Sequence, residues 1–432
     1  MIILFRQFRI SVLSMLIIIM AFSSLNMVAA EGKSDNDPFT SVENFLAEID
    51  KNNYSESLNY FVKPMKEEFS LFIQNKENEG TGILGVKKAK LKGYKELDHT
   101  AAQNYTPYFD AITAQYNNVH FFYVAVDYKV TAESEMNMNG INYIFVAVVM
   151  EDGEWRIAQY SVAPVDNIVG DNQGFNTSDE QNWVKQYRER FKGDYLNRSN
   201  KILKTNAKLD VENEENTAAT MEMSGLAVQA ADEFERPATI KVKLMKNANW
   251  THYKCIGVGC IVDVDFYYYI KNTLVNEWTY ISPMEALKSG AMAVKMYAWF
   301  AVYNPLSPLG NYALNDGIAP SGTYPDQAFD VKTEKSRTTD AINAVGNLAM
   351  GDLRNNVVRL FLARYALGQY NGTFDAHTGE LQQEGSRWWA EPLTTTDPNT
   401  GAIIYRNKDM YWILDYYYLG STEVADLVFF TY

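Results

Sequence analysis

One carboxyl side chain in the sequence combines two features that favour acid–base chemistry. Glu277 ends the segment FYYYIKNTLVNE (266–277). Phe266, Ile270 and Leu274 recur in this segment at helical spacing, and the acid continues their stripe. An acid on an apolar face loses water, and an acid at a helix C-terminus meets the negative end of the dipole, so both settings favour the protonated form. These are the conditions for a general acid near neutral pH. The alternative is a helix that frays before Glu277 and leaves the side chain solvated.

A second helix is expected directly after this acid. Residues 282–285 read S-P-M-E, a capping box with proline in the first helical position, which predicts where the helix begins. It should run to about Val302, because Asn304-Pro305 cannot continue it. Gly290 makes this helix thin, so we expect a neighbouring element to approach it closely.

The first half of the chain predicts an α+β plan. A helical pattern opens at Thr40, and residues 119–130 and 141–150 then change to strand periodicity. Residues 151–154, Glu-Asp-Gly-Glu, join the second of these strands to WRIAQYSV as a hairpin. Helices followed by a curled antiparallel sheet resemble, in pattern only, a nuclear-transport-factor-two-like cone domain, which we place at residues 31–165. Such domains are binding or spacer modules, and we expect a spacer.

Composition suggests how the rest of the chain is divided. Residues 166–237 are polar and contain one charged helix, WVKQYRERFKGDYL, so we interpret them as a linker. A second domain, residues 238–432, begins near the alternating segment TIKVKLM.

The first 30 residues have the pattern of a secretory signal peptide. Arg6 and Arg9 precede the apolar run ISVLSMLIIIMAF, and small residues occupy the cleavage positions before residue 31. A retained anchor is the alternative, and in that case the signal segment would be the only membrane contact. We expect a secreted protein that is associated with the cell wall.

Charge excludes some classes of partner. Removal of residues 1–30 deletes two arginines and no acids, so the net charge becomes −14 − 2 = −16. Nucleic acid and anionic lipid are disfavoured, because neutralising phosphates requires clustered Lys and Arg. An uncharged polymer remains compatible, and the aromatic content of 14% hints at surfaces on which sugars stack.

The two cysteines are expected to form a local disulfide. Cys255 and Cys260 flank the turn I-G-V-G, and export favours their oxidation. The histidines are scattered and no C-x-x-C pair exists, so we expect no metal and no cofactor.

The region around Glu277 also resembles a known family. The run DFYYYIKNTLVNEWTYISPMEALKSGAMAVKMYAW is similar to the signature of the stage II sporulation protein D (SpoIID) family, approximately VPLEEYVKGVVAAEMP followed by W-x-x-EALKAQAVAARTYA. Lys295 stands where the family has arginine. TYPDQAF (323–329) places Gln327 on the family's glutamine, and RTTDAI (337–342) places Asp340 on its aspartate. Further similarity at 360–372 and 411–424 extends the resemblance over roughly 238–430.

The resemblance implies action on peptidoglycan, because family members are lytic transglycosylases or enhancers of wall amidases. A lytic transglycosylase needs one carboxyl group, since the 6-hydroxyl of the muramic acid attacks its own anomeric carbon. Glu277 would protonate the glycosidic oxygen and then withdraw the hydroxyl proton. Where some members carry zinc ligands, this chain has Pro325 and Asp326, so no metal is implied.

Several side chains are candidates for binding a glycan strand. The resemblance suggests that Gln327 and Lys295 orient Glu277 or an acetamido group, although solvation of a helix face also explains Lys295. Trp278 could form an apolar wall beside the acid or belong to the core. In the shortened loop EGSRWWAEPL (384–393), Trp388 and Trp389 could stack on a sugar or form a buried pair. Asp340 completes the candidate set.

Two functions remain open at this stage. The intact surroundings of Glu277 favour a lytic transglycosylase that cleaves peptidoglycan glycan strands. The altered loop at 384–393 favours a non-catalytic protein that binds the wall or enhances an amidase, with other cell-wall or sporulation proteins as partners. We expect the enzyme.

Overall fold

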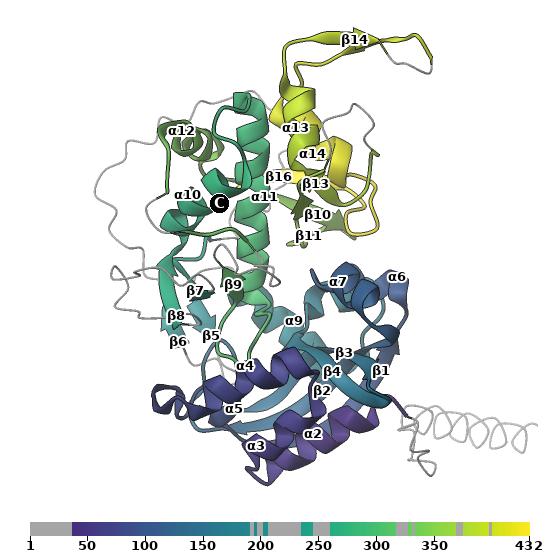
Figure 1. Ribbon diagram of the computed structural model, residues 1–432, viewed down its shortest axis with the longest axis vertical. Helices are drawn as coiled ribbons and strands as arrows, with labels where there is room; N and C mark the ends of the chain where they lie inside the picture. The colour runs from purple at the N-terminus through teal and green to yellow at the C-terminus, as the bar shows by residue number, and fades with distance from the viewer. Residues whose placement is uncertain are drawn as a thin grey trace, which may run out of the picture.

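The computed structural model describes residues 37–190, 194–196, 202–205, 235–244, 260–316, 327–330, 333–368, 375–396 and 400–432. The architecture is mixed α+β with several antiparallel sheets, which confirms the predicted fold class. The N-terminal half lies at the bottom of Figure 1, and the C-terminal half, in green to yellow, lies above it. The predicted signal peptide is outside the described residues. Within the described ranges, no helix has the length and apolarity needed to cross a bilayer.

The N-terminal half is built on a four-stranded antiparallel sheet whose strands are neighbours both in sequence and in space. In order across the sheet they are β1 (Val86–Leu97), β2 (Asn117–Val130), β3 (Gly140–Glu151) and β4 (Glu154–Val162). The β3–β4 turn consists of Asp152 and Gly153, with φ of 53° and 83°, and positive φ at both positions is what a type I′ turn requires. The hairpin predicted at residues 151–154 is confirmed.

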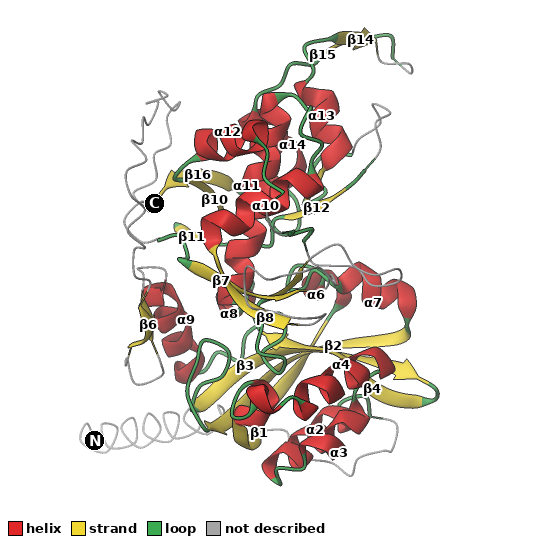
Figure 2. Ribbon diagram, turned by 60° about the vertical axis from the view of Figure 1, so that its left-hand side comes forward, coloured by secondary structure: helices red, strands yellow, loops and turns green. Residues whose placement is uncertain are grey.

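Helices cover both faces of this sheet, because the central strands are apolar on both sides. α2 (Thr40–Asp50), α3 (Tyr54–Ser57) and α4 (Lys63–Gln74) cover one face (Figure 2), and Phe122 and Val124 of β2 join the core beneath them. On the other face Phe121 and Phe145 pack with α6 (His99–Ala102) and α7 (Phe109–Gln115). Short elements complete this half: η1 (Leu58–Tyr60), η2 (Lys76–Asn78) and α5 (Gly82–Gly85).

The segment predicted as a linker begins with two helices, α8 (Val165–Gly170) and α9 (Ser178–Arg190), that pack on the sheet. The Glu180 carboxylate at the start of α9 is fully buried, and it accepts hydrogen bonds from Tyr123 OH at 2.8 Å and from two backbone amides, those of Phe175 and Asn176. Such a buried acid anchors the helix to strand β2. After α9, the described part of this segment is the hairpin of β5 (Asp194–Leu196) and β6 (Ile202–Thr205) and the residues from 235 on.

The C-terminal half is organised around one long buried helix, α11 (Met284–Tyr303). Of its 20 residues, 16 are buried, as expected for a helix that is apolar all round. Four helices surround it: α10 (Phe266–Glu277), α12 (Ser336–Val345), α13 (Gln383–Ala390) and α14 (Met410–Tyr418) (Figures 1 and 2).

Short strands pack around this helical cluster. One sheet has the order β8 (Cys260–Asp265), β7 (Thr239–Leu244), β9 (Leu314–Asp316), and another has the order β11 (Val357–Arg359), β10 (Leu348–Arg354), β16 (Leu427–Thr431). β12 (Arg364–Ala366) runs parallel to β13 (Glu380–Gln382), and the hairpin of β14 (Thr394–Thr396) and β15 (Ile403–Tyr405) projects from the body (Figure 1). The β12–β13 pairing brings the segments around residues 365 and 383 together.

The helices around Glu277 begin and end close to the predicted positions. α10 spans Phe266–Glu277 as expected, and the Asp265 side chain caps it by accepting from the Tyr268 amide at 2.7 Å. The capping box predicted for α11 is wrong. Pro283 is the N-cap residue without a side-chain cap, and the Glu285 carboxylate instead accepts from the backbone amide of Met410 at 3.0 Å.

The two halves share one continuous hydrophobic cluster of buried residues. The amide of Val162 donates to Pro305 O at 3.0 Å, just beyond α11, and the buried side chains of Arg359 and Asp166 form an ion pair across the boundary at 3.4 Å. The structure therefore places the N-terminal sheet firmly against the base of the helical cluster.

Candidate active site

Four chain segments that are distant in sequence converge on the half-buried carboxyl of Glu277. It ends α10, and it accepts hydrogen bonds from the amide of Ala328 at 2.6 Å and from the hydroxyl of Tyr365 in β12 at 3.2 Å, both on Oε1. Its Oε2 accepts from Nε2 of Gln383, the first residue of α13, at 3.0 Å. Glu277 is therefore a held side chain and not a fraying helix end.

Trp278 fixes the position of this carboxyl. The helix stops at Glu277 because Trp278 is extended (φ −111°, ψ 133°) and turns its indole into the core, where it is 2% exposed. Its Nε1 donates to Ser386 Oγ in α13 at 3.1 Å, and its ring lies on Gly290 of α11. The prediction was that a neighbouring element approaches the helix closely at Gly290, and that element is the indole of Trp278, the residue directly after the acid.

A chain of oriented hydrogen bonds leads to Glu277. Tyr269 OH donates to Oε1 of Gln327 at 2.7 Å, while Nε2 of Gln327 donates to Val294 O at 3.3 Å and to Tyr365 OH at 3.0 Å. A backbone carbonyl can only accept, so Val294 fixes which end of the amide carries the protons. The Tyr365 hydroxyl thus accepts from Gln327 and donates its proton to Glu277.

The directions of the hydrogen bonds to Glu277 decide which of its two carboxyl oxygens can carry a proton. Oε1 of Glu277 receives two donors, from the Ala328 amide and Tyr365 OH, which occupy both of its lone pairs. Oε2 receives one donor, from Gln383. A proton on Glu277 therefore lies on Oε2, the oxygen beside the first turn of α13.

Burial raises the pKa of Glu277 above its ordinary value, the direction expected from its place on an apolar stripe. The donors on Ala328, Tyr365 and Gln383 stabilise the carboxylate and oppose this effect, but desolvation is the largest contribution. None of the described groups hydrogen-bonded to Glu277 is a second carboxylate. The arrangement supplies one proton donor and acceptor, held by neutral groups.

The structure brings some of the predicted site residues together. Gln327 is buried and reaches Glu277 through Tyr365, and Trp278 is packed directly behind the acid. Trp388 and Trp389 belong to a core aromatic cluster: Trp388 is 7% exposed under the guanidinium of Arg406, and Trp389 packs on Trp412. The two rings pack against each other, as the interpretation as a core pair expects, with Trp388 buried and Trp389 half-buried.

Two predicted residues lie elsewhere. Lys295 is buried and donates to the carbonyl oxygens of Gly346 and Leu348, away from Glu277. Asp340 is exposed on α12 and forms no hydrogen bond with Glu277 or its described partners. The prediction that these two side chains join Glu277 in one site is corrected by this placement.

The cysteines and the expected absence of metal concern other parts of the chain. Cys260, the first residue of β8, is disulfide-bonded, while Cys255, Pro325 and Asp326 lie outside the described residues. In the described part of the chain, no cluster of three or more His, Cys, Asp or Glu side chains could hold a metal ion.

Sequence reasoning missed two direct partners of the acid, Tyr365 and Gln383. Tyr365 lies inside the segment LFLARYALGQYNG, and Gln383 precedes the loop EGSRWWAEPL by one residue. Exposed apolar side chains also lie close to these elements: Leu367 follows β12, and Tyr280 and Ile281 follow α10. The available signal was a polar side chain inside the first segment, Tyr365, and one directly before the second, Gln383.

No protein-family model matches the sequence, and no curated protein matches it.

Proposed function

We propose that the chain is an exported peptidoglycan lytic transglycosylase in which Glu277 is the single acid and base. The observation that carries the proposal is one carboxyl of raised pKa, held by Ala328, Tyr365 and Gln383 with its proton directed to Oε2. The resemblance of residues 238–430 to the stage II sporulation protein D family supplies the substrate class.

In the proposed reaction Oε2 of Glu277 protonates the glycosidic oxygen as its bond to the anomeric carbon of muramic acid breaks. The 6-hydroxyl of the same sugar then forms a bond to that carbon, and the Glu277 carboxylate accepts the hydroxyl proton. The products are a glycan with a free hydroxyl and a 1,6-anhydro-muramyl end, and Glu277 regains its proton. The nucleophile is intramolecular, so the enzyme need not position a water or a second carboxylate.

The product identifies the reaction. Purified glycan strands, with and without stem peptides, would be digested in ¹⁸O-labelled water and the ends analysed by mass spectrometry. A lytic transglycosylase gives anhydro ends without ¹⁸O, whereas a hydrolase gives reducing ends that carry the label. Labelled reducing ends would refute the proposed chemistry.

A second candidate function is a non-catalytic protein that binds the wall or enhances an amidase. The burial of Trp388 and the packing of Trp389 on Trp388 and Trp412 favour it, because the loop at 384–393 then offers less of the stacking faces that a sugar would use. Binding of glycan strands without any change in their ends would support this function.

The rate of strand cleavage should fall as pH rises through the pKa of Glu277, because the first step needs the protonated acid. Gln383→Leu removes a donor that stabilises the carboxylate, so the pKa of Glu277 should rise further and the alkaline fall in rate should move to higher pH. The check is the rate of anhydro-end release against pH, with ¹³C NMR of the Glu277 carboxyl as a second readout.

Gln382→Leu is the matched control, since Gln382 is adjacent but donates no hydrogen bond to Glu277. If Gln383→Leu left both profiles in place, or moved them to lower pH, the assigned role of this donor would be wrong.

A further inference from the structure

The two side-chain donors of Glu277 come from one small ribbon, the parallel pair β12 and β13. Tyr365 is the middle residue of β12, and Gln383 follows the last residue of β13. Each strand has three residues. A parallel pair of this length is not stable by itself, because it forms few hydrogen bonds and parallel pairing is the weaker kind. Tertiary contacts must therefore hold the ribbon next to the acid.

Arg364, the first residue of β12, forms such a contact on the side of the strand opposite to Tyr365. Successive side chains of a strand point to opposite faces, so Tyr365 reaches Glu277 while Arg364 points away from it. The Arg364 guanidinium forms an ion pair with Oε1 of Glu423, and these two side chains are 14% and 2% exposed. Breaking a buried ion pair is costly, because the remaining charge is left without a partner.

The Glu423 carboxylate also contacts the beginning of β13. It lies against Gly379, the residue before that strand, so closely that a Cβ there would collide with Oε2. Thr422 Oγ1 donates to the same oxygen at 3.0 Å. Arg354, which pairs with Asp171 of the N-terminal half, donates to Glu423 O at 2.9 Å. Glu423 therefore joins the beginnings of both strands and is itself linked to the N-terminal half.

Two further acids face Arg364. Glu380 of β13 is its partner in the strand register, and Oδ2 of Asp110 in α7 lies 3.9 Å from its Nη1. Burial is the main cause of the raised pKa of Glu380; Arg364 opposes it, and Asp110 and Glu423 add to it. Without the guanidinium, these acids would repel one another across the two strands.

We propose that Arg364 and Glu423 act as a positioning pair for the candidate active site. By fixing the β12–β13 ribbon, the pair keeps Tyr365 and Gln383 within hydrogen-bond distance of the acid. Burial and three hydrogen bonds set the pKa of Glu277, and Arg364 takes part in none of these bonds. Its influence therefore passes through the donors. The consequence for glycan cleavage rests on the proposed function, whereas the position of the donors is measured on the protein alone.

The first test measures the pKa of Glu277 by ¹³C NMR of its carboxyl, without glycan. Arg364→Met keeps the approximate length of the side chain and removes its charge. Tyr365 and Gln383 should then move away from the carboxylate that they stabilise, so the pKa of Glu277 should rise. Arg364→Lys keeps a charge for Glu423 and should raise this pKa less. It also carries the test if the methionine variant does not fold.

The background Tyr365→Phe/Gln383→Leu separates positioning from the simple loss of a nearby charge. Both side-chain donors are absent in this background, so Arg364→Met should raise the pKa of Glu277 no further there. A direct electrostatic effect of the missing guanidinium would persist.

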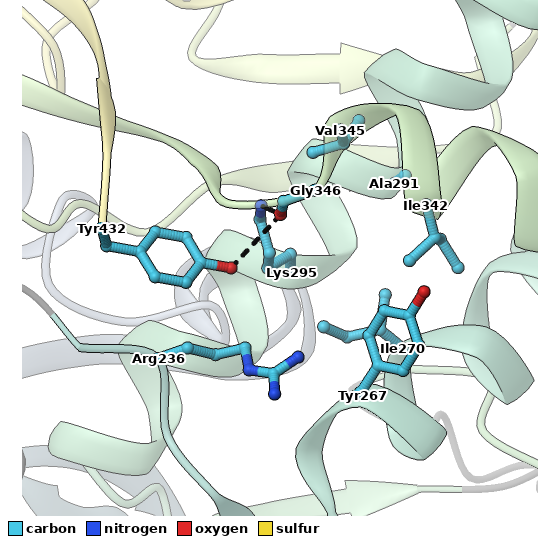
Figure 3. Close-up of a pocket in the computed structure, with 9 residues that line it drawn as sticks. All are labelled: Arg236, Tyr267, Ile270, Ala291, Lys295, Ile342, Val345, Gly346 and Tyr432. Atoms are coloured by element: carbon cyan, nitrogen blue, oxygen red, sulfur yellow. Dashed lines mark hydrogen bonds between the residues drawn. The ribbon is translucent and has the colours of Figure 1, made fainter. Parts of the chain in front are cut away.

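Two control variants each remove a buried cation that does not contact the ribbon. Arg359 of β11 forms its ion pair with an acid of α8. Lys295 of α11 contacts Gly346 O and the ring of Tyr432 (Figure 3). Arg359→Met and Lys295→Met should leave the pKa of Glu277 unchanged, whatever their effect on stability.

The rate of cleavage is the second readout. Arg364→Met should lower kcat roughly tenfold, because a small misplacement of a reacting group is costly, and leave KM unchanged. The proposal is overturned if every folded Arg364 variant keeps the wild-type pKa of Glu277, if the controls move this pKa equally, or if its rise persists in the donor-free background. If the pKa moves as expected but the wild type cleaves no strands, the positioning pair stands and the proposed function fails.

Discussion

Glu277→Gln is expected to lower the release of 1,6-anhydro-muramyl ends by roughly 10³-fold, within the range for loss of a general acid. Glutamine has nearly the same size, and its carbonyl oxygen can still accept from the Ala328 amide and Tyr365 OH at the Oε1 position. The position of Oε2 would then carry an amide, which cannot transfer a proton to the glycosidic oxygen. The measurement is the initial rate of strand cleavage, with products identified by mass.

Stability separates lost chemistry from lost structure in this variant. The pKa of Glu277 is raised on folding, so its protonated form stabilises the folded state, and this contribution is lost as pH rises from the unfolded pKa through the folded one. Glutamine has no charge to bury, so at pH 8 the Tm of Glu277→Gln should equal or exceed that of the wild type. Glu334→Gln, at an exposed acid, should leave both rate and Tm unchanged. A folded Glu277→Gln protein that cleaves at the wild-type rate would exclude Glu277 as the acid.

Gly290→Ala is expected to lower the free energy of unfolding by about 3 kcal/mol, the upper part of the usual range for overpacking a core. A Cβ at this position would lie 2.5 Å from Cδ2 and 2.7 Å from Cε2 of Trp278. The indole cannot retreat easily, because it is buried and bonded to Ser386. The gain in helix propensity, about 1 kcal/mol, is too small to offset the clash. Urea denaturation measures the change.

The double variant Trp278→Leu/Gly290→Ala isolates the cause. Leucine leaves room for the new methyl group, so the cost of the pair should be smaller than the sum of the two single costs. Since Trp278 follows Glu277 directly, Gly290→Ala should also disturb the acid and reduce cleavage. A stabilised Gly290→Ala protein would show that the indole does not occupy this space.

The sequence predicted those parts of the fold that depend on neighbours along the chain. The bounds of α10 followed from apolar spacing, and the β3–β4 hairpin followed from Asp152-Gly153, because such residues accept the positive φ of a tight turn. The capping box at α11 failed because Glu285 has a tertiary partner, the amide of Met410, that lies 125 residues away.

The candidate site was predictable only at its centre. Glu277 stood out by its place at the end of a helix, but Tyr365 and Gln383 reach it from 88 and 106 residues away, and a local pattern has no information about such distances. Lys295 was assigned to the site from its position in a family motif. In the structure its side chain points toward α12 and β16, because the position of a residue around the axis of α11 sets the direction in which its side chain leaves the helix.

The hydrophobic cluster that runs through both halves has a practical consequence. A fragment starting at residue 235 would lack the N-terminal sheet that packs against the base of α11. The apolar side chains at that base would be exposed to water and would promote aggregation. Heating the intact protein should therefore produce a single melting event. The N-terminal half is therefore a rigid support for the helices that carry Glu277, and not a separately moving domain.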